Sequence, residues 1–401
     1  MEGKLKKSFS GRRGKDVRSD CYIEIQRKRS GGIQIQLTSK VESMYGASIR
    51  ELVHRILHFY ETKNAHVLVE DAGALHWIIA ARCEAALRRM NVGWDKDFLL
   101  PVRKKSVRAS SRDRFRRSRL YLPGTEPKVF VNAGLHKPDC IILDLEDSVS
   151  PAEKDSARLL VRNALRHVDF KDAERMVRIN QLPEGIEDLR HVIPYNVQTV
   201  LLPKCESAES VREVEQEIER LSALHTIKNK VWLLPIIESA LGVVRAFEIA
   251  SASNRNCAIA IGLEDYTADL GVTRTKAGRE SLYARSAIVN AAKAAGLQAM
   301  DSVFSDVSDD EGLRQSALEA KAIGFDGKGC IHPRQIKIVH EVFAPTAEEI
   351  AYATQVVDAF KNAQRSGSGV VALGSKMIDA PVVKRAQRVL ALASQQTVTR
   401  D

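Results

Sequence analysis

Long hydrophobic runs are absent from this sequence of 401 residues. Hydrophobic residues make up 44% of the chain, but they fall into short stretches, and none approaches the roughly 20 residues that span a bilayer. The first residues are basic and polar and lack the apolar segment of a signal peptide. We therefore expect a cytoplasmic protein with no membrane partner.

Cysteine is also scarce, with six residues in the chain. They form neither a Cys-x-x-Cys pair nor another metal-ligand spacing, and most stand in apolar stretches. This pattern indicates buried free thiols in a reducing compartment. Internal repeats and low-complexity tracts are absent too, and the length favours two or more globular domains.

Acidic residues are nearly missing from two segments of a chain whose net charge is +10. Residues 103–119 contain nine basic residues and a single acid, Asp113, and residues 4–18 hold seven further basic residues. A like-charged segment repels itself, so we interpret the longer run as a solvated linker, with a contact for phosphate groups as the alternative. Nucleic acid is not expected, because the run lacks the series of aromatic residues on which bases stack.

What the sequence does contain is a series of short apolar runs that end in charged residues. Runs of Val, Ile and Leu are typical of strands buried on both faces, and they occur at residues 140–143, 176–179, 199–202, 231–234 and 258–261. Each is followed by a stretch of helical periodicity, which predicts a (β/α)8 TIM barrel whose chemistry lies at the C-terminal strand ends. The polar residues at those ends are Asp144, Glu146, Arg178, Lys204, Glu238, Glu264, Asp265, Asp301 and His332.

The chain divides into four predicted parts. Residues 1–90 form a small α+β two-layer module, 91–117 the basic linker, 118–343 the barrel and 344–401 a C-terminal helical lid or extension. Within the first part we expect a flexible start over residues 1–20. The rest of the module is predicted to contain alternating strands at 21–25 and 33–37 with a turn at Gly31-Gly32, a strand at 65–69, and helices at 48–60 and 74–90.

Seven motifs of the barrel region occur in the order found in one known family. They are Arg117-Ser-Arg-Leu-Tyr-Leu-Pro-Gly124, Ile141-Ile-Leu-Asp-Leu-Glu-Asp-Ser148, Val177-Arg-Ile-Asn180, Leu202-Pro-Lys-Cys-Glu-Ser207, Pro235-Ile-Ile-Glu-Ser239, Gly262-Leu-Glu-Asp-Tyr266 and Cys330-Ile-His-Pro333. Through them, residues 115–395 resemble the citrate lyase beta subunit of the HpcH/HpaI aldolase superfamily. The resemblance implies a Mg²⁺-dependent carbon–carbon lyase that cleaves a citryl thioester, on an acyl carrier protein or on CoA, into oxaloacetate and an acetyl thioester.

The front module is similar to the citrate lyase gamma subunit, a small acyl carrier. Leu68-Val-Glu-Asp-Ala-Gly-Ala-Leu75 and Ile79-Ala-Ala-Arg-Cys-Glu-Ala85 support this similarity. Such a carrier bears a phosphoribosyl-dephospho-CoA group on a serine. Arg18 stands where that serine is expected, and Ser19 follows it, so either Ser19 carries the group or the module is an unmodified docking domain.

The resemblance also assigns roles to the strand-end residues. Glu238 and Asp265 match the metal ligands, and two carboxylates with substrate oxygens and waters are the usual set for Mg²⁺. Arg178 matches a substrate-binding position, and its planar fork suits a carboxylate. Glu146 is expected to hold the base that takes the proton from the tertiary hydroxyl.

Each role has a structural alternative. Glu238 can instead be a first-turn helix acid, and Glu264 can take the part of Asp265. Arg178 can serve a buried ion pair with Glu146 or Asp144. For Lys204 we expect an ion pair or a contact with the thioester cofactor rather than a Schiff base. For His332 a structural hydrogen-bond network is favoured over general-base chemistry, and Asp301 is a candidate contact for the pantetheine arm.

The tail contains Gly374-Ser-Lys-Met-Ile-Asp-Ala-Pro381, which resembles the segment that reaches over a neighbouring subunit's active site in related acyl-CoA lyases. Asp379 is then the acid that protonates the enolate, and the protein is a homo-oligomer, with a citrate lyase alpha subunit as a candidate partner. The alternative for Asp379 is a helix N-cap.

Two other functions remain open at this stage. One is a citramalyl-CoA or malyl-CoA type lyase that acts on free CoA thioesters, with the front module vestigial. The other is a non-catalytic scaffold that docks an acyltransferase subunit, which the complete set of Arg178, Glu238 and Asp265 disfavours.

Overall fold

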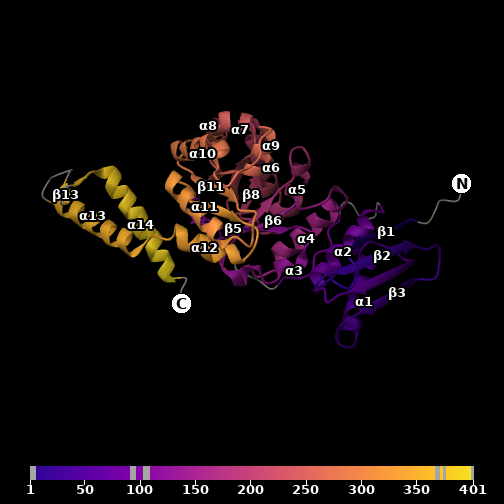
Figure 1. The fold of residues 1–401 in the computed structure, drawn as a ribbon. Coiled ribbons are helices and arrows are strands. Elements are labelled where there is room, and N and C mark those ends of the chain that lie inside the picture. The colour runs from indigo at the N-terminus through magenta and orange to yellow at the C-terminus, as the bar shows by residue number, and fades with distance from the viewer. Residues whose placement is uncertain (1–5, 91–95, 103–108, 366–370, 374–375, 399–401) are drawn as a thin grey trace.

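The computed structural model describes residues 6–90, 96–102, 109–365, 371–373 and 376–398. The side chains of 365–377 and 395–398 are not described. An N-terminal α+β module, a closed barrel and a C-terminal helical extension follow one another along the molecule (Figure 1). The predicted fold class is confirmed.

The N-terminal module is a four-stranded sheet with two helices. Its strands have the order β1-β2-β4-β3, with β2 antiparallel and β3 parallel to β4. The bounds are β1 Lys7–Gly11, β2 Cys21–Arg27, β3 Ile33–Ser39, α1 Glu42–Phe59, β4 Ala65–Asp71 and α2 His76–Arg88. Gly31 and Gly32 both have positive φ, which glycine adopts without strain, so the predicted turn is present.

The prediction of a flexible start was wrong for β1. Its polar sequence, Lys-Ser-Phe-Ser-Gly, carries no strand periodicity, but it pairs with β2 over five residues. An edge strand needs only one hydrogen-bonded neighbour and can leave much of its surface in solvent, so its side chains need not be apolar.

The barrel consists of eight parallel strands that close between β12 and β5. Their bounds are β5 Ser118–Pro123, β6 Cys140–Asp144, β7 Glu174–Arg178, β8 Thr199–Leu202, β9 Trp232–Ile237, β10 Ala258–Ile261, β11 Gln298–Val303 and β12 Gly327–Cys330. The surrounding helices are α3 Pro127–Phe130, α4 Lys154–His167, α5 Glu184–Val192, α6 Ala208–Leu224, α7 Ala240–Val244, α8 Ala246–Ser251, α9 Leu263–Asp269, α10 Leu282–Ala294, α11 Asp310–Ile323 and α12 Arg334–Phe343. The five predicted strands are all present.

The second half of the basic run, residues 109–117, is not a solvated linker. Arg116 is fully buried and pairs with Glu174 at 2.7 Å, and Arg117 pairs with Asp139 at 2.9 Å. Glu174 and Asp139 lie at the N-terminal ends of their strands, so the two arginines cover the N-terminal end of the barrel. The prediction overlooked them because their acidic partners are more than 20 residues away in sequence. Residues 103–108 lie outside the described residues.

The C-terminal extension contains α13 Ala347–Arg365, the short strands β13 Val371–Leu373 and β14 Lys376–Ile378, and α14 Ala380–Val398. It projects from the barrel near α12, on the side away from the N-terminal module (Figure 1). The two predicted helices are confirmed, and they pack through their own small apolar cluster. Among the described helices, none combines the length and the apolarity that crossing a membrane requires.

Candidate active site

A pocket of about 460 Å³ opens at the C-terminal ends of the barrel strands. Its walls include Arg178 from the end of β7, Glu238 just after β9, and Asp265 in the first turn of α9. Because parallel strands all end at the same rim, residues 60 positions apart (Arg178 and Glu238) and 27 positions apart (Glu238 and Asp265) meet here. The structure thus brings the predicted metal ligands and Arg178 to one pocket.

Arg178 is fixed at the rim by a bidentate contact with Asp144 of β6. Its Nε and Nη2 donate to the two carboxylate oxygens at 2.7 and 2.8 Å, and Nη1 lies 2.8 Å from Glu146 Oε2. Burial alone would raise the pKa of Asp144, but the hydrogen bonds and the charge of Arg178 outweigh burial and lower that pKa. The ion pair anticipated as a structural alternative is therefore present, and it orients a guanidinium that also lines the pocket.

Glu146 and Lys204 form the next part of the network. Lys204 Nζ donates to Glu146 Oε1 at 3.0 Å and to Asp147 Oδ1 at 3.2 Å. Burial raises the pKa of Glu146, against the opposing charges of Arg178 and Lys204. Lys204 has a φ of +46°, a left-handed conformation that non-glycine residues seldom adopt. Lys204 is thus held in an ion-pair network, as expected, and its pKa is raised by Glu146 and Asp147 despite burial.

Glu238 lies just after the end of β9 and is buried beside Gly262. Its Oε2 accepts a hydrogen bond of 2.8 Å from the Lys204 backbone N–H, and its carboxylate occupies the space where a Cβ on Gly262 would lie. Burial raises the pKa of Glu238 to about 7, and the negative charges of Glu146 and Asp265 add to this effect. Any larger residue at 262 would displace the carboxylate.

The two predicted metal ligands differ in exposure. The side chain of Asp265 is 43% exposed and lies 3.9 Å from Lys204 Nζ, whereas Glu238 is 6% exposed. Glu264, the alternative to Asp265, is instead engaged by Arg274, whose Nη1 donates to it at 2.6 Å. This pairing leaves Asp265 as the more available carboxylate of the two.

The donor set fits Mg²⁺. Within the described part of the chain, no group of three or more His, Cys, Asp or Glu side chains forms a ready-made metal site. Glu238 and Asp265 both line the pocket, so they would supply two carboxylates and leave the other positions to waters and substrate oxygens. That arrangement is the usual one for Mg²⁺.

Asp301, His332 and Asp379 are not part of the cluster formed by Arg178, Glu238 and Asp265. Asp301 is buried in ion pairs with Lys328 at 2.6 Å and Arg285 at 3.2 Å, although it reaches the pocket wall. His332 is exposed, and its Nδ1 accepts from the Arg334 backbone N–H at 3.2 Å, consistent with the favoured structural role.

Asp379 lies just before α14, outside the residues that line this pocket. Its Oδ1 accepts from the Val382 N–H at 3.3 Å, as a helix N-cap does. Gly374 and Ser375 of the predicted lid segment lie outside the described residues. Within one chain, therefore, Asp379 caps a helix and does not line the pocket.

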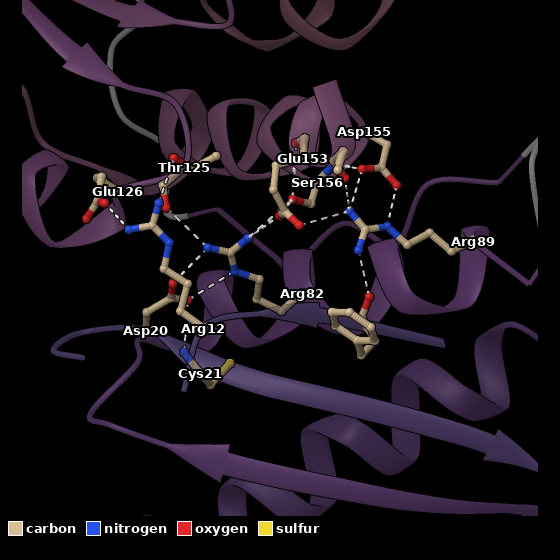
Figure 2. A network of polar contacts seen from close by, with 12 residues as sticks. Arg12, Asp20, Cys21, Arg82, Arg89, Thr125, Glu126, Glu153, Asp155 and Ser156 are labelled. Atoms are coloured by element: carbon tan, nitrogen blue, oxygen red, sulfur yellow. Dashed lines mark hydrogen bonds and ion pairs between the residues drawn. The ribbon is translucent and has the colours of Figure 1, made fainter. Parts of the chain in front are cut away.

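Ser19 lies in the loop between β1 and β2, at the seam between the N-terminal module and the barrel. Its backbone N–H donates to the Ala72 carbonyl at 3.0 Å. Arg82 of α2 grips the neighbouring Asp20 with two hydrogen bonds, of 3.0 and 2.7 Å, and also donates to Ser156 of the barrel (Figure 2).

The seam continues on both sides of Arg82. Arg89 donates twice to Asp155, at 2.6 Å each, and Arg12 contacts Glu126 and Thr125 (Figure 2). Deeper in the seam, apolar residues of α2 and α4 share one core cluster. The module is thus joined to the barrel by hydrogen bonds, ion pairs and apolar packing.

Two pocket residues were quoted in motifs but given no role from the sequence. Tyr121 and Arg119 are alternate residues of β5 and both line the pocket. The Tyr121 ring stacks with Arg178 at 5.4 Å. Side chains alternate between the two faces of a strand, so Pro123, Tyr121 and Arg119 face the same side. This alternation could have predicted Tyr121 and Arg119 as pocket residues.

Comparison with known proteins agrees with this geometry. Residues 117–333 match the family HpcH/HpaI aldolase/citrate lyase. The chain belongs to this family. Residues 13–90 match a second family, ACP, described as the malonate decarboxylase delta subunit, which confirms a carrier-like front module.

Individual relatives support the same assignment. Citrate lyase subunit beta of Haemophilus influenzae is 44% identical over 282 residues, covering 69% of this chain and 96% of that protein. Mitochondrial citramalyl-CoA lyase of Mus musculus is 35% identical over 291 residues, covering 70% and 86%. The structure of CitE from Mycobacterium tuberculosis with magnesium, acetoacetate and coenzyme A is 33% identical with a TM-score of 0.57, covering 71% of this chain and all of that one. The prediction of a lyase of this family is confirmed.

Proposed function

We propose that this chain cleaves a citryl thioester into oxaloacetate and an acetyl thioester in a reaction that requires Mg²⁺. The single observation that carries the proposal is the meeting of Arg178, Glu238 and Asp265 in one pocket, with Glu146 2.8 Å from the Arg178 guanidinium. The proposal also draws on relatives that are citrate lyase beta subunits and on a CitE structure that contains magnesium and coenzyme A.

Arg178 is proposed to bind the carboxylate beside the tertiary hydroxyl. Asp144 holds the guanidinium by two hydrogen bonds, so little side-chain entropy is lost when substrate binds. Tyr121 packs against the guanidinium plane and limits its rotation. Glu238 and Asp265 would hold Mg²⁺, which when bound polarises the oxygens of the hydroxy acid.

Glu146 is proposed to take the proton from the tertiary hydroxyl. Its pKa is raised by burial, which makes the carboxylate a stronger base than an exposed glutamate. As the proton leaves, the alkoxide oxygen becomes the ketone of oxaloacetate. The electron pair of the broken carbon–carbon bond moves toward the thioester carbonyl as an enolate. Lys204, hydrogen-bonded to Glu146, keeps that carboxylate in place.

Asp379 of a second chain is proposed to protonate the enolate carbon. In its own chain Asp379 is a helix cap outside the pocket, so this role requires a homo-oligomer in which the extension of one chain covers the site of another. The projection of α13 and α14 away from the barrel (Figure 1) is compatible with such reach.

The front module is proposed to present or dock the acyl thioester. If Ser19 carries phosphoribosyl-dephospho-CoA, the chain works as a fused carrier and lyase, with an alpha subunit to load it. The fixed seam beside Asp20 (Figure 2) instead favours a module that stays on the barrel while a free CoA thioester enters the pocket. This seam is the observation behind the second candidate function, a citramalyl-CoA or malyl-CoA type lyase.

Two experiments test these proposals. Cleavage of citryl-CoA by the purified chain should yield oxaloacetate with Mg²⁺ and none with EDTA. An intact mass of the protein from its native host, with the adduct mapped by peptide sequencing, should show a phosphoribosyl-dephospho-CoA group on Ser19 if the carrier is active. An unmodified mass that retains full turnover of citryl-CoA would reject the carrier role and keep the lyase.

A further inference from the structure

Arg119 is a buried cation without a carboxylate partner among the described residues. It is the second residue of β5 and is 1% exposed. Its Nη2 donates to the carbonyl oxygen of Asp301 at 2.7 Å, while Nε and Nη1 have no hydrogen-bond partner within the part of the chain that is described. A buried guanidinium lacking a counter-ion is costly, because no opposite charge offsets its lost hydration.

The other long cationic side chains buried to the same degree each have an acid within 2.7 Å. The pairs are Arg82 with Asp20, Arg116 with Glu174, Arg162 with Glu84, and Lys328 with Asp301. These four pairs show how the fold normally stabilises a buried cation. Arg119 departs from the pattern at a position that lines the active-site pocket, where a ligand can bring the missing charge.

The position of Arg119 is set by strand alternation. Arg119, Tyr121 and Pro123 of β5 all line the pocket, with Pro123 at the C-terminal end of the strand and Arg119 two residues below Tyr121. Arg178 contacts the Tyr121 ring near the rim. A substrate held by Arg178 therefore lies in the same pocket as Arg119.

We propose that Arg119 binds a second carboxylate of the substrate and thereby selects hydroxyacyl thioesters that carry a carboxymethyl group. The inference rests on the proposed function and deepens it. The tertiary carbon of a citryl thioester bears a hydroxyl, a carboxylate, a carboxymethyl group and the thioester arm. With Arg178 on the first carboxylate, the carboxymethyl group supplies the counter-charge that Arg119 lacks. Citramalyl-CoA has a methyl group there and leaves Arg119 unpaired.

The test compares citryl-CoA with citramalyl-CoA in wild type, R119M and R119K. Methionine keeps most of the length of the arginine side chain and removes its charge, whereas lysine keeps the charge. A charge-assisted hydrogen bond lost on substitution corresponds to roughly 10- to 150-fold in affinity. For R119M we expect kcat/KM for citryl-CoA to fall by about 100-fold, mainly through KM, with less than a threefold change for citramalyl-CoA. R119K should retain part of the preference. Equal losses for both thioesters would overturn the proposal and leave Arg119 a structural residue.

A binding measurement keeps the two proposals separable. Calorimetry with Mg²⁺ present should show that wild type binds oxaloacetate more tightly than pyruvate, and that R119M loses this preference. If wild type does not cleave citryl-CoA, the proposed function fails, while the binding ratio still decides on Arg119. An unchanged preference for oxaloacetate in a folded R119M protein would contradict the inference.

Discussion

Replacing Glu84 with Gln should destabilise the whole protein by about 3 kcal/mol. Glu84 is fully buried in α2, and both of its oxygens accept from Arg162 of α4, at 3.0 and 2.7 Å. Removing one partner of a buried ion pair costs roughly 3–5 kcal/mol, because the other charge stays buried and unpaired. Asp97, 2.8 Å from Arg162, offsets part of that loss, so we expect the lower end of the range.

Urea unfolding followed by circular dichroism measures this effect. The matched control is Glu209→Gln, which breaks an exposed pair with Arg212 and should leave the stability almost unchanged, because solvent screens such a pair. Because Glu84 and Arg162 join the front module to the barrel, we expect the wild type to unfold in one transition and the variant to unfold in two. A loss below about 1 kcal/mol with one unchanged transition would refute the view that this pair holds the module in place.

The remaining predictions concern the pocket. Glu238→Gln should abolish Mg²⁺ binding by calorimetry and lower kcat/KM by about 100- to 10,000-fold, and a variant that binds Mg²⁺ normally would remove Glu238 from the metal site. In EDTA, the folded Glu238 carboxyl, with its pKa of about 7, stays protonated while the unfolded one ionises near 4.5. The free energy of unfolding should therefore fall as the pH rises between these values, by up to about 1.4 kcal/mol per pH unit. Urea unfolding of Glu238→Gln should not show this pH dependence. The same pH dependence in wild type and variant would mean that another group causes it. Arg178→Met and Asp379→Asn should each be inactive. Mixed oligomers of the two variants should regain activity, because one chain supplies Arg178 and the other supplies Asp379 to the same site. Mixtures that stay inactive would argue against a site shared between two chains.

The barrel was predictable because its strands are buried on both faces. Runs such as 140–143 and 258–261 are typical of such strands, and a barrel places their ends at one rim. The sequence therefore predicted that Arg178, Glu238 and Asp265 would meet. It offered Asp144 or Glu146 as an ion-pair partner of Arg178 but could not show that Asp144 would take both bonds of the bidentate contact, since a strand-end acid has several possible partners.

What the sequence missed depends on long-range pairing. β1 is polar and is defined only by its partner β2, and the buried role of Arg116 depends on Glu174, 58 residues away. The seam around Arg82 (Figure 2) likewise joins residues that only the folded chain brings together. Local patterns carry no information about such partners.

The measurement that tests the central claim most directly is the identity of the keto acid released by the purified wild-type chain. With citryl-CoA and Mg²⁺ we predict oxaloacetate, detected by its enzymatic reduction with NADH, and no product when EDTA is present. Release of pyruvate from citramalyl-CoA without any oxaloacetate from citryl-CoA would contradict the proposed substrate. Failure to cleave either thioester would contradict the proposed chemistry.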